Sequence, residues 1–208
     1  MLNIVVLVSG GGTNLQALLD AKAAGQIPGG NFVRVISSAA GAYALERAKN
    51  AGVPGVVIER KGKTAEEFET ALLSELEAAE ADLIVLAGFM TILSEKIIEK
   101  YPEKIINVHP ALIPSFCGKG FYGLKVHEAA LEKGVKVTGA TVHFVNEIPD
   151  GGRIIAQKAV DVLDGDTPEI LQRRVMEQAE WKILPEAVKL FCDGRIKVEN
   201  NRVIIKGE

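Results

Sequence analysis

The chain has 208 residues, of which 48% are hydrophobic and 5% aromatic, and its formal net charge is -3. This length and apolar content suit one globular domain with a sizeable core. The acidic and basic residues are interleaved, which excludes the strongly basic surface that would attract nucleic acids. No apolar run reaches the roughly 18 residues that span a bilayer, and the first residues lack the features of a signal peptide, so we expect a cytoplasmic protein acting on a small polar substrate.

Short β-branched runs alternate with helical patterns in the first half of the chain. The predicted strands are 3–9, 31–38, 55–59, 82–88 and 104–109. The predicted helices are 14–25, 42–52, 64–81 and 94–101, and Thr64 with Glu67 resembles a capping box. This alternation predicts an α/β fold with a doubly wound, mostly parallel, Rossmann-like sheet, in which ligands bind beyond the carboxyl ends of the strands.

The pattern changes after His109. Residues 111–123 form a loop rich in Gly and Pro, and an ordered loop of this length favours a functional role. A helix over 124–134, strands over 135–146 and 153–162, and a long helix over 167–194, bent or broken at Pro185, are expected next. The tail reads as a hairpin turned at Asn200 and Asn201. No repeat or linker is evident, which favours a single domain over residues 1–208.

The first predicted strand leads directly into the sequence SGGGTN, after which a helix begins. Glycines allow backbone N–H groups to approach an anion closely, Ser9 and Thr13 add hydroxyls, and the helix start at Asn14 contributes a positive dipole end. The spacing matches neither the dinucleotide pattern nor a Walker A loop. We therefore expect a phosphomonoester site, and the alternative is a tight strand-to-helix turn without a ligand.

Two polar residues end the fifth predicted strand, in the sequence INVHP. Asn107 and His109 are two residues apart, so they project from one face, and Pro110 stops the strand. Asp150 lies on a later Asp-Gly-Gly turn, and a carboxylate near His109 would raise the imidazole pKa above its reference value of about 6.5. His143 precedes this turn on a strand and is a candidate for the same pocket. The alternatives are a satisfied histidine and an ordinary Asp-Gly turn.

The two cysteines, His127 and the apolar segment 89–93 each allow a functional and a structural interpretation. Cys117 could act as a nucleophile with His109 as its base, although nothing in the sequence shows an activated thiolate. His127 reads as a surface or packing residue of a helix. Cys117 and Cys192 lack metal or disulfide spacing. The apolar segment 89–93 at the end of the fourth strand is either core or the edge of a site for a flat aromatic ligand.

Together, SGGGTNLQALL, DLIVLAGFMTILS, INVHPALIP and GATVHFVNEIPDGGRII resemble the phosphoribosylglycinamide formyltransferase family, the folate-dependent transformylases of purine biosynthesis. The resemblance covers nearly the whole chain in order. It implies formyl transfer from 10-formyltetrahydrofolate, as co-substrate, to the amine of glycinamide ribonucleotide, without a metal. It also divides the domain into a ribonucleotide-binding half, 1–100, and a catalytic and folate-binding half, 101–208.

The resemblance implies that Asn107, His109 and Asp150 are catalytic. Asn107 and protonated His109 would donate to the tetrahedral oxyanion, and Asp150 would keep the imidazole charged and oriented. The implied ribonucleotide contacts are Gly11, Gly12, Thr13, Asn14 and Glu180. The implied folate contacts are Met90, Thr91, Ile92, Leu93, Asn107, His143, Asn146, Glu147, Ile148, Pro149 and Asp150.

The chain departs from the family pattern in several places. Thr91 and Ala65 stand where the family often has Arg, Trp181 stands where His commonly follows the Glu, and the loop SFCGKGFYG is longer than in some relatives.

Three other functions compete with formyl transfer to the ribonucleotide. A formyltetrahydrofolate hydrolase usually carries an extra amino-terminal domain, a methionyl-tRNA formyltransferase needs a further carboxyl-terminal domain and a basic surface, and a silent nucleotide-binding module would not need all three polar residues. We expect small-molecule substrates, no nucleic acid or membrane partner, and a monomer or homodimer.

Overall fold

The computed structural model describes residues 1–207. The chain divides into two compact units, Met1–Ile106 and Asn107–Glu208. Each unit is described below by itself.

The first unit holds a parallel sheet in the order β3-β2-β1-β4. Its strands are β1 (Leu2–Val8), β2 (Gly30–Ser37), β3 (Gly55–Val57) and β4 (Leu83–Leu86). Residues 4–8 of β1 and 83–85 of β4 have no exposed surface, as expected of apolar strands covered on both faces. The chain runs outward from β1 to β3 and returns to the other side of β1 at β4. The carboxyl ends of β1 and β4 therefore mark the switch point where such sheets bind ligands.

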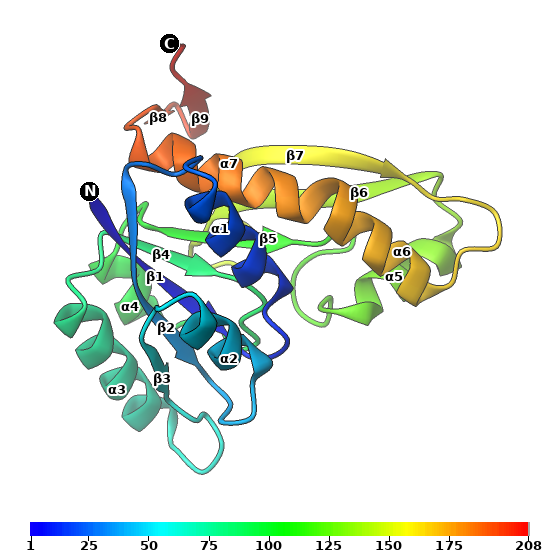
Figure 1. Cartoon of the computed structure of the whole chain (residues 1–208). Coiled ribbons are helices and arrows are strands. Elements are labelled where there is room, and N and C mark those ends of the chain that lie inside the picture. Colours follow the sequence, from blue (N-terminus) through cyan, green and yellow to red (C-terminus); the bar gives the residue numbers. More distant parts are fainter. Residues whose placement is uncertain (208) are drawn as a thin grey trace. The chain divides into compact units, whose positions relative to one another are not determined.

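Four helices connect these strands (Figure 1). The helices are α1 (Thr13–Ala23), α2 (Tyr43–Asn50), α3 (Ala65–Ala78) and α4 (Glu95–Lys100). The predicted capping box of α3 is confirmed, because Thr64 accepts from the Glu67 N–H and the Glu67 carboxylate accepts from the Thr64 N–H. A similar cap at Ser94 starts α4.

The second unit contains the end of β5 (Ile105–His109), followed in sheet order by β6 (Val137–Phe144) and β7 (Ile154–Asp161). β6 and β7 are antiparallel, so the sheet is mostly rather than wholly parallel, as predicted. Their register shifts between Val142 and His143. His143 pairs with Ile154 while Val142 pairs with Ala156, so the extra residue is Ile155 on β7 and β6 remains regular at His143.

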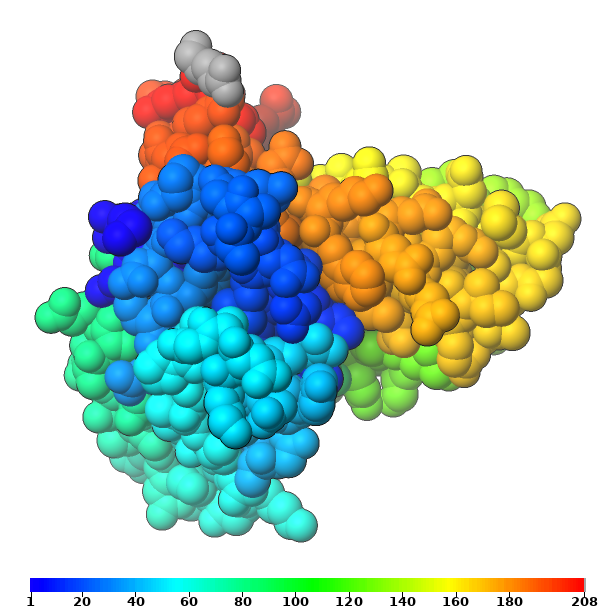
Figure 2. Space-filling view, viewed as in Figure 1, coloured from blue at the N-terminus to red at the C-terminus, as the bar shows by residue number. Residues whose placement is uncertain are grey.

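A continuous helix runs along β6 and β7 (Figure 1), and Figure 2 shows its orange surface beside the yellow surface of β7. It consists of α6 (Pro168–Val175), the π-helical turn η1 (Met176–Glu180) and α7 (Trp181–Cys192), while α5 (Leu124–Lys133) packs against α6. A break at Pro185 is wrong, because Pro185 lies inside α7, and a bend there stays a prediction. Proline removes the bond to the carbonyl four residues earlier, at Trp181, and the irregular turn η1 ends at that point instead.

The carboxyl-terminal hairpin is confirmed. β8 (Ile196–Glu199) pairs antiparallel with β9 (Arg202–Ile205), and Asn200 and Asn201 both have positive φ at its turn. Among residues 1–207, no helix has the length and apolarity to cross a bilayer.

Candidate functional site

The loop after β1 turns its carbonyl oxygens toward α2. The Gly10 carbonyl accepts from the Ala44 N–H at 3.1 Å, and the Gly11 carbonyl accepts from Arg47 Nε at 2.8 Å. Within residues 1–207, the N–H groups of Gly10, Gly11 and Gly12 have no backbone acceptor. The loop therefore presents amide donors beside the start of α1, an arrangement suited to an anion.

The three glycines of this loop differ in their surroundings. Gly12 has φ of 71°, and a Cβ there would lie 2.6 Å from the Ala44 Cβ, so close packing on α2 explains this glycine. A Cβ on Gly10 or Gly11 would meet nothing within 4 Å. The tight-turn alternative thus accounts for Gly12, whereas Gly10 and Gly11 border space that a ligand can use.

Ser9 joins the ends of β1 and β4. Its hydroxyl accepts from the Met90 N–H at 2.9 Å and shares a 2.7 Å hydrogen bond with the Ser38 hydroxyl. The Ser9 oxygen therefore already accepts a backbone N–H, while its part in an anion site stays a prediction.

The segment after β4 contains exposed apolar side chains. Met90 is 54% and Ile92 is 74% exposed, whereas Leu93 is only 7% exposed and belongs to the core. Exposed apolar groups at the carboxyl end of a strand suit a flat ligand. Leu93 can contribute to such a site only through its backbone or as support.

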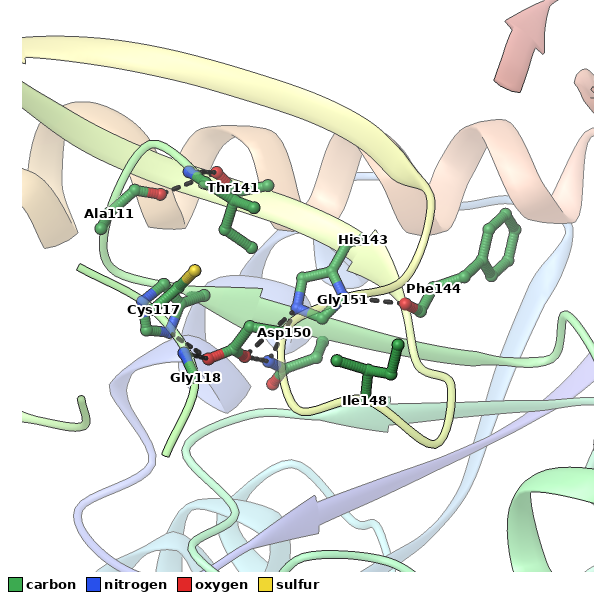
Figure 3. A network of polar contacts seen from close by, with 12 residues as sticks. Ala111, Cys117, Gly118, Thr141, His143, Phe144, Ile148, Asp150 and Gly151 are labelled. Carbon is green, nitrogen blue, oxygen red and sulfur yellow. Dashed lines mark hydrogen bonds and ion pairs between the residues drawn. The ribbon is translucent and has the colours of Figure 1, made fainter. Parts of the chain in front are cut away.

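In the second unit, the structure brings together Asn107, His109 and Asp150. Asp150 Oδ2 lies 3.5 Å from His109 Nδ1, and Asp150 Oδ1 lies 3.5 Å from Asn107 Nδ2. Asp150 has a positive φ of 55°, an uncommon conformation that recurs at functional sites. Figure 3 shows the Asp150 carboxylate between Gly118 and His143.

The loop after β5 contacts two of these residues through its backbone. The Phe116 carbonyl accepts from His109 Nε2 at 2.8 Å, and the Gly118 N–H donates to Asp150 Oδ2 at 2.8 Å. This loop was expected to be functional, and it holds both the histidine and the carboxylate in place.

His143 extends the same network. Its side chain is 2% exposed, and its Nε2 lies 3.2 Å from Asn107 Nδ2 and 3.6 Å from Asp150 Oδ1. The structure thus places His143 beside the three predicted catalytic residues. Even so, among residues 1–207 no group of three or more His, Cys, Asp or Glu side chains is arranged to hold a metal ion.

Burial and close contacts oppose each other in setting the charges of His109 and Asp150. Burial lowers the pKa of His109 below its usual 6.5, and the opposing effects of Asp150 and the Phe116 carbonyl are smaller. The prediction of a raised His109 pKa is therefore wrong, because desolvation of the charged imidazole outweighs its carboxylate neighbour. Burial also raises the pKa of Asp150, but the contacts with His143, His109 and the Gly118 N–H outweigh burial and leave that pKa below its usual value. At neutral pH the unliganded site holds a carboxylate and a mostly neutral imidazole.

Cys117 does not have the properties of a nucleophile. Burial raises the pKa of its thiol, the nearby Asp150 raises it further, and the thiol donates to the Pro114 carbonyl at 3.3 Å. An activated cysteine requires the opposite shift. The structure therefore does not support the cysteine alternative.

The turn between β6 and β7 is built around Asn146. Its Oδ1 accepts from the Ile148 N–H at 3.2 Å, and its Nδ2 donates to the Gly151 carbonyl at 3.4 Å. Ile148 is 59% exposed, and Glu147 and Pro149 are also exposed. The Asn146 side chain thus shapes the turn, while its neighbours remain accessible to a ligand.

Glu180 lies in the π-helical turn η1 and is 5% exposed. Buried carboxylates are uncommon, and π-helical turns occur frequently at functional sites. These two features agree with the site assignment that the resemblance implies for Glu180.

His127 on α5 is fully buried, and in the described part of the chain neither of its ring nitrogens has a hydrogen-bond partner. Burial lowers the pKa of His127 to about 4, and the charge of His109 lowers it further. Of the two readings left open by the sequence, His127 is a packing residue.

We expect His127 to make the protein less stable in acid. Between its ordinary pKa of 6.5 and its folded pKa of about 4, only the unfolded chain binds the proton, so stability falls as the pH drops through this window. The full difference corresponds to about 3 kcal/mol of unfolding free energy. Urea unfolding at pH 7 and near pH 4.5 should show this loss in the wild type and a smaller one in His127→Leu. Equal pH dependence in the two proteins would contradict the prediction.

The chain is similar to known proteins over nearly its whole length. The formyl transferase family matches residues 2–188. The chain belongs to the formyl transferase family. The chain is 41% identical over 209 residues to phosphoribosylglycinamide formyltransferase from Haemophilus influenzae. This match covers 100% of the chain and 95% of the relative. The predicted resemblance is thereby confirmed.

Similar solved structures agree on the fold. Glycinamide ribonucleotide transformylase 1 from Symbiobacterium toebii has a TM-score of 0.93 and 45% identity, with 100% of this chain and 95% of that chain covered. A formyltetrahydrofolate deformylase from Pseudomonas syringae has a TM-score of 0.89 and 26% identity, with 99% of this chain but 66% of that chain covered. The predicted mostly parallel α/β fold is confirmed.

Sequence reasoning missed the residues that act through their backbone or as supports. Phe116 and Gly118 contribute a carbonyl and an N–H, and any residue type carries these groups. Thr141 is buried and holds the start of the loop, because its hydroxyl donates to the Ala111 carbonyl and accepts from the Ile113 N–H. The Gly and Pro content of the loop was the only available signal, and it indicated the segment without these atoms.

Proposed function

We propose that this protein transfers the formyl group from 10-formyltetrahydrofolate to the amine of N1-(5-phosphoribosyl)glycinamide, which gives the N-formyl product and tetrahydrofolate in de novo purine (IMP) biosynthesis. The observation that carries the proposal is the cluster of Asn107, His109 and Asp150, with both carboxylate contacts at 3.5 Å. Full-length similarity to a phosphoribosylglycinamide formyltransferase supports the choice of substrate.

The cluster suits direct transfer through a tetrahedral intermediate. The substrate amine attacks the formyl carbon, and the formyl oxygen becomes an oxyanion that Asn107 stabilises as an N–H donor, joined by His109 when its Nε2–H leaves the Phe116 carbonyl. His109 takes up the proton lost by the amine, and Asp150 orients the ring and stabilises its positive charge. The bond from the formyl carbon to N10 of the folate then breaks, and the imidazole passes that proton to N10. Neither a metal nor a covalent enzyme intermediate is required.

The binding contacts are part of the same proposal. Gly11, Gly12, Thr13 and Asn14 bind the ribonucleotide phosphate, and Glu180 binds its ribose or amine end. The folate pterin lies against residues 90–93 and 146–150, where backbone N–H and C=O groups can read its edge. We propose further that the enzyme works in the cytoplasm as a monomer or homodimer.

An absorbance assay of tetrahydrofolate formation tests the proposed function. Purified protein should consume 10-formyltetrahydrofolate only when the ribonucleotide is present, and a chelator should leave the rate unchanged. Folate turnover that is independent of the ribonucleotide would favour the hydrolase, which the similarity to a deformylase makes the second candidate. Absence of turnover with tight ribonucleotide binding would favour the silent module.

Gly11→Ala tests the phosphate site. The added methyl meets nothing within 4 Å, so the protein should fold normally, but the methyl enters the space beside the amide donors. We expect the KM for the ribonucleotide to rise on the order of 10-fold or more, with little change in the KM for the folate. Gly12→Ala provides the contrast, because its methyl clashes with Ala44 and should lower the Tm. An unchanged ribonucleotide KM in Gly11→Ala would contradict the assignment.

A further inference from the structure

The tautomer of His143 is determined by its own backbone. His143 Nδ1 lies 2.8 Å from the Phe144 carbonyl, and Figure 3 shows this bond at the end of β6. A carbonyl oxygen can only accept, so Nδ1 must carry the proton. In the neutral ring, Nε2 is then a lone-pair acceptor.

This lone pair faces the side-chain amide of Asn107. Asn107 Nδ2 lies 3.2 Å from His143 Nε2 and 3.5 Å from Asp150 Oδ1, so two acceptors surround the same amide nitrogen. The reverse orientation would place the amide oxygen against a lone pair and a carboxylate. A proton on His143 Nε2 would instead confront the Asn107 NH2 group. The neutral ring with the proton on Nδ1 lets Nε2 and Asp150 Oδ1 both accept from the Asn107 amide, and the two acceptors then lie 3.6 Å apart without a hydrogen bond between them.

We infer that His143 is a positioning residue, whose Nδ1–H tautomer orients the Asn107 amide with its NH2 group toward Asp150. One N–H of Asn107 binds His143 Nε2. The other makes only the long 3.5 Å contact with Asp150 and is the one that can turn to a developing oxyanion. The inference rests on the proposed function for the oxyanion role of Asn107, and the orientation itself does not depend on that function.

Two features of the backbone hold His143 in this position. The register shift opposite His143 inserts Ile155 as an extra residue on β7, so β6 itself stays regular and its alternation sets the side of the sheet on which the imidazole lies. The Phe144 carbonyl is confined by Gly152, where a Cβ would lie 1.7 Å from the carbonyl oxygen, while the Phe144 N–H donates to the Arg153 carbonyl at 2.9 Å. The acceptor that selects the tautomer is therefore itself fixed.

Nitrogen NMR of the unliganded wild-type protein at neutral pH tests the tautomer directly. The chain has three histidines, so His109→Gln and His127→Leu samples allow the His143 signals to be assigned. We expect a protonated Nδ1 and an unprotonated Nε2 on His143. A proton on Nε2, in either the other tautomer or the charged ring, would overturn the inference.

Two substitutions of His143 test its effect on catalysis. The Gln side chain can place its oxygen near the former Nε2 and accept from Asn107, whereas the shorter Asn side chain can replace only Nδ1. We expect His143→Asn to lower kcat by roughly 10- to 100-fold with a nearly unchanged ribonucleotide KM, and His143→Gln to stay within about 5-fold of wild type. Equal losses in two folded variants, or a larger loss in His143→Gln, would overturn the inference.

The two experiments separate this inference from the proposed function. If the wild type has no formyl transfer activity, the proposed function fails, while the NMR result still decides the tautomer and the Asn107 orientation. If both variants fail to fold, the NMR result for the wild type likewise decides. Transfer activity together with a proton on Nε2 would retain the function and reject the inference.

Discussion

Asp150→Asn should lower kcat by roughly 10²- to 10³-fold while leaving the ribonucleotide KM nearly unchanged. The substitution preserves the shape of the side chain and an oxygen that can accept from the Gly118 N–H. It removes the negative charge 3.5 Å from His109 Nδ1, which favours a charged imidazole against the effect of burial. Steady-state kinetics with both substrates measure the effect, and the pKa of His109, followed by NMR, should fall further.

The matched control for this prediction is Asp164→Asn. Asp164 is fully exposed and lies 4.0 Å from the Lys136 ammonium, so the same chemical change there removes only a weak surface pair. Its kcat should equal that of the wild type. Near-normal turnover in Asp150→Asn would refute the role of the carboxylate, and a raised ribonucleotide KM with normal kcat would place Asp150 in substrate binding instead.

Gly152→Ala should lower the free energy of unfolding by roughly 2–4 kcal/mol and reduce kcat as well. The added Cβ would lie 1.7 Å from the Phe144 oxygen and 2.7 Å from its carbonyl carbon. Both are backbone atoms of β6 and cannot yield as a flexible side chain would. Relief of the clash moves the carbonyl that binds His143 Nδ1, so stability and activity should fall together. Urea unfolding followed by the fluorescence of Trp181, the single tryptophan, measures the first effect.

Gly41→Ala is the control for this second prediction. A Cβ on Gly41 meets nothing within 4 Å, so its unfolding free energy should stay within about 0.5 kcal/mol of wild type. Wild-type stability in Gly152→Ala would show that the turn can rearrange, and would remove the packing reason for the second glycine of the Asp-Gly-Gly turn.

Local patterns predicted most elements of the fold because they act over a few residues. The continuous apolar runs of β1 and β4 are buried on both faces, Thr64 caps α3, and Asn200 and Asn201 turn the hairpin. The helix around Pro185 is the exception. The missing N–H of Pro185 predicts a bend or break there, but the helix continues through Pro185 in contact with β6 and β7, and the irregular turn is η1, just before α7.

The sequence by itself determined which side chains could carry the chemistry. The spacing of Asn107 and His109 puts them on one face of a strand, whereas the Asp-Gly-Gly turn alone favoured an ordinary turn, and the family resemblance pointed to Asp150. Residue types and short-range periodicity are properties of the chain, so they can be read without coordinates.

Only the tertiary structure decided how these groups are charged and oriented. Burial lowers the pKa of His109 despite the Asp150 carboxylate, and desolvation depends on the atoms that surround a group in space. The Phe144 carbonyl sets the tautomer of His143, which in turn orients Asn107. Backbone carbonyls and N–H groups occur at almost every position, so their partners cannot be read from residue types and follow only from the folded chain.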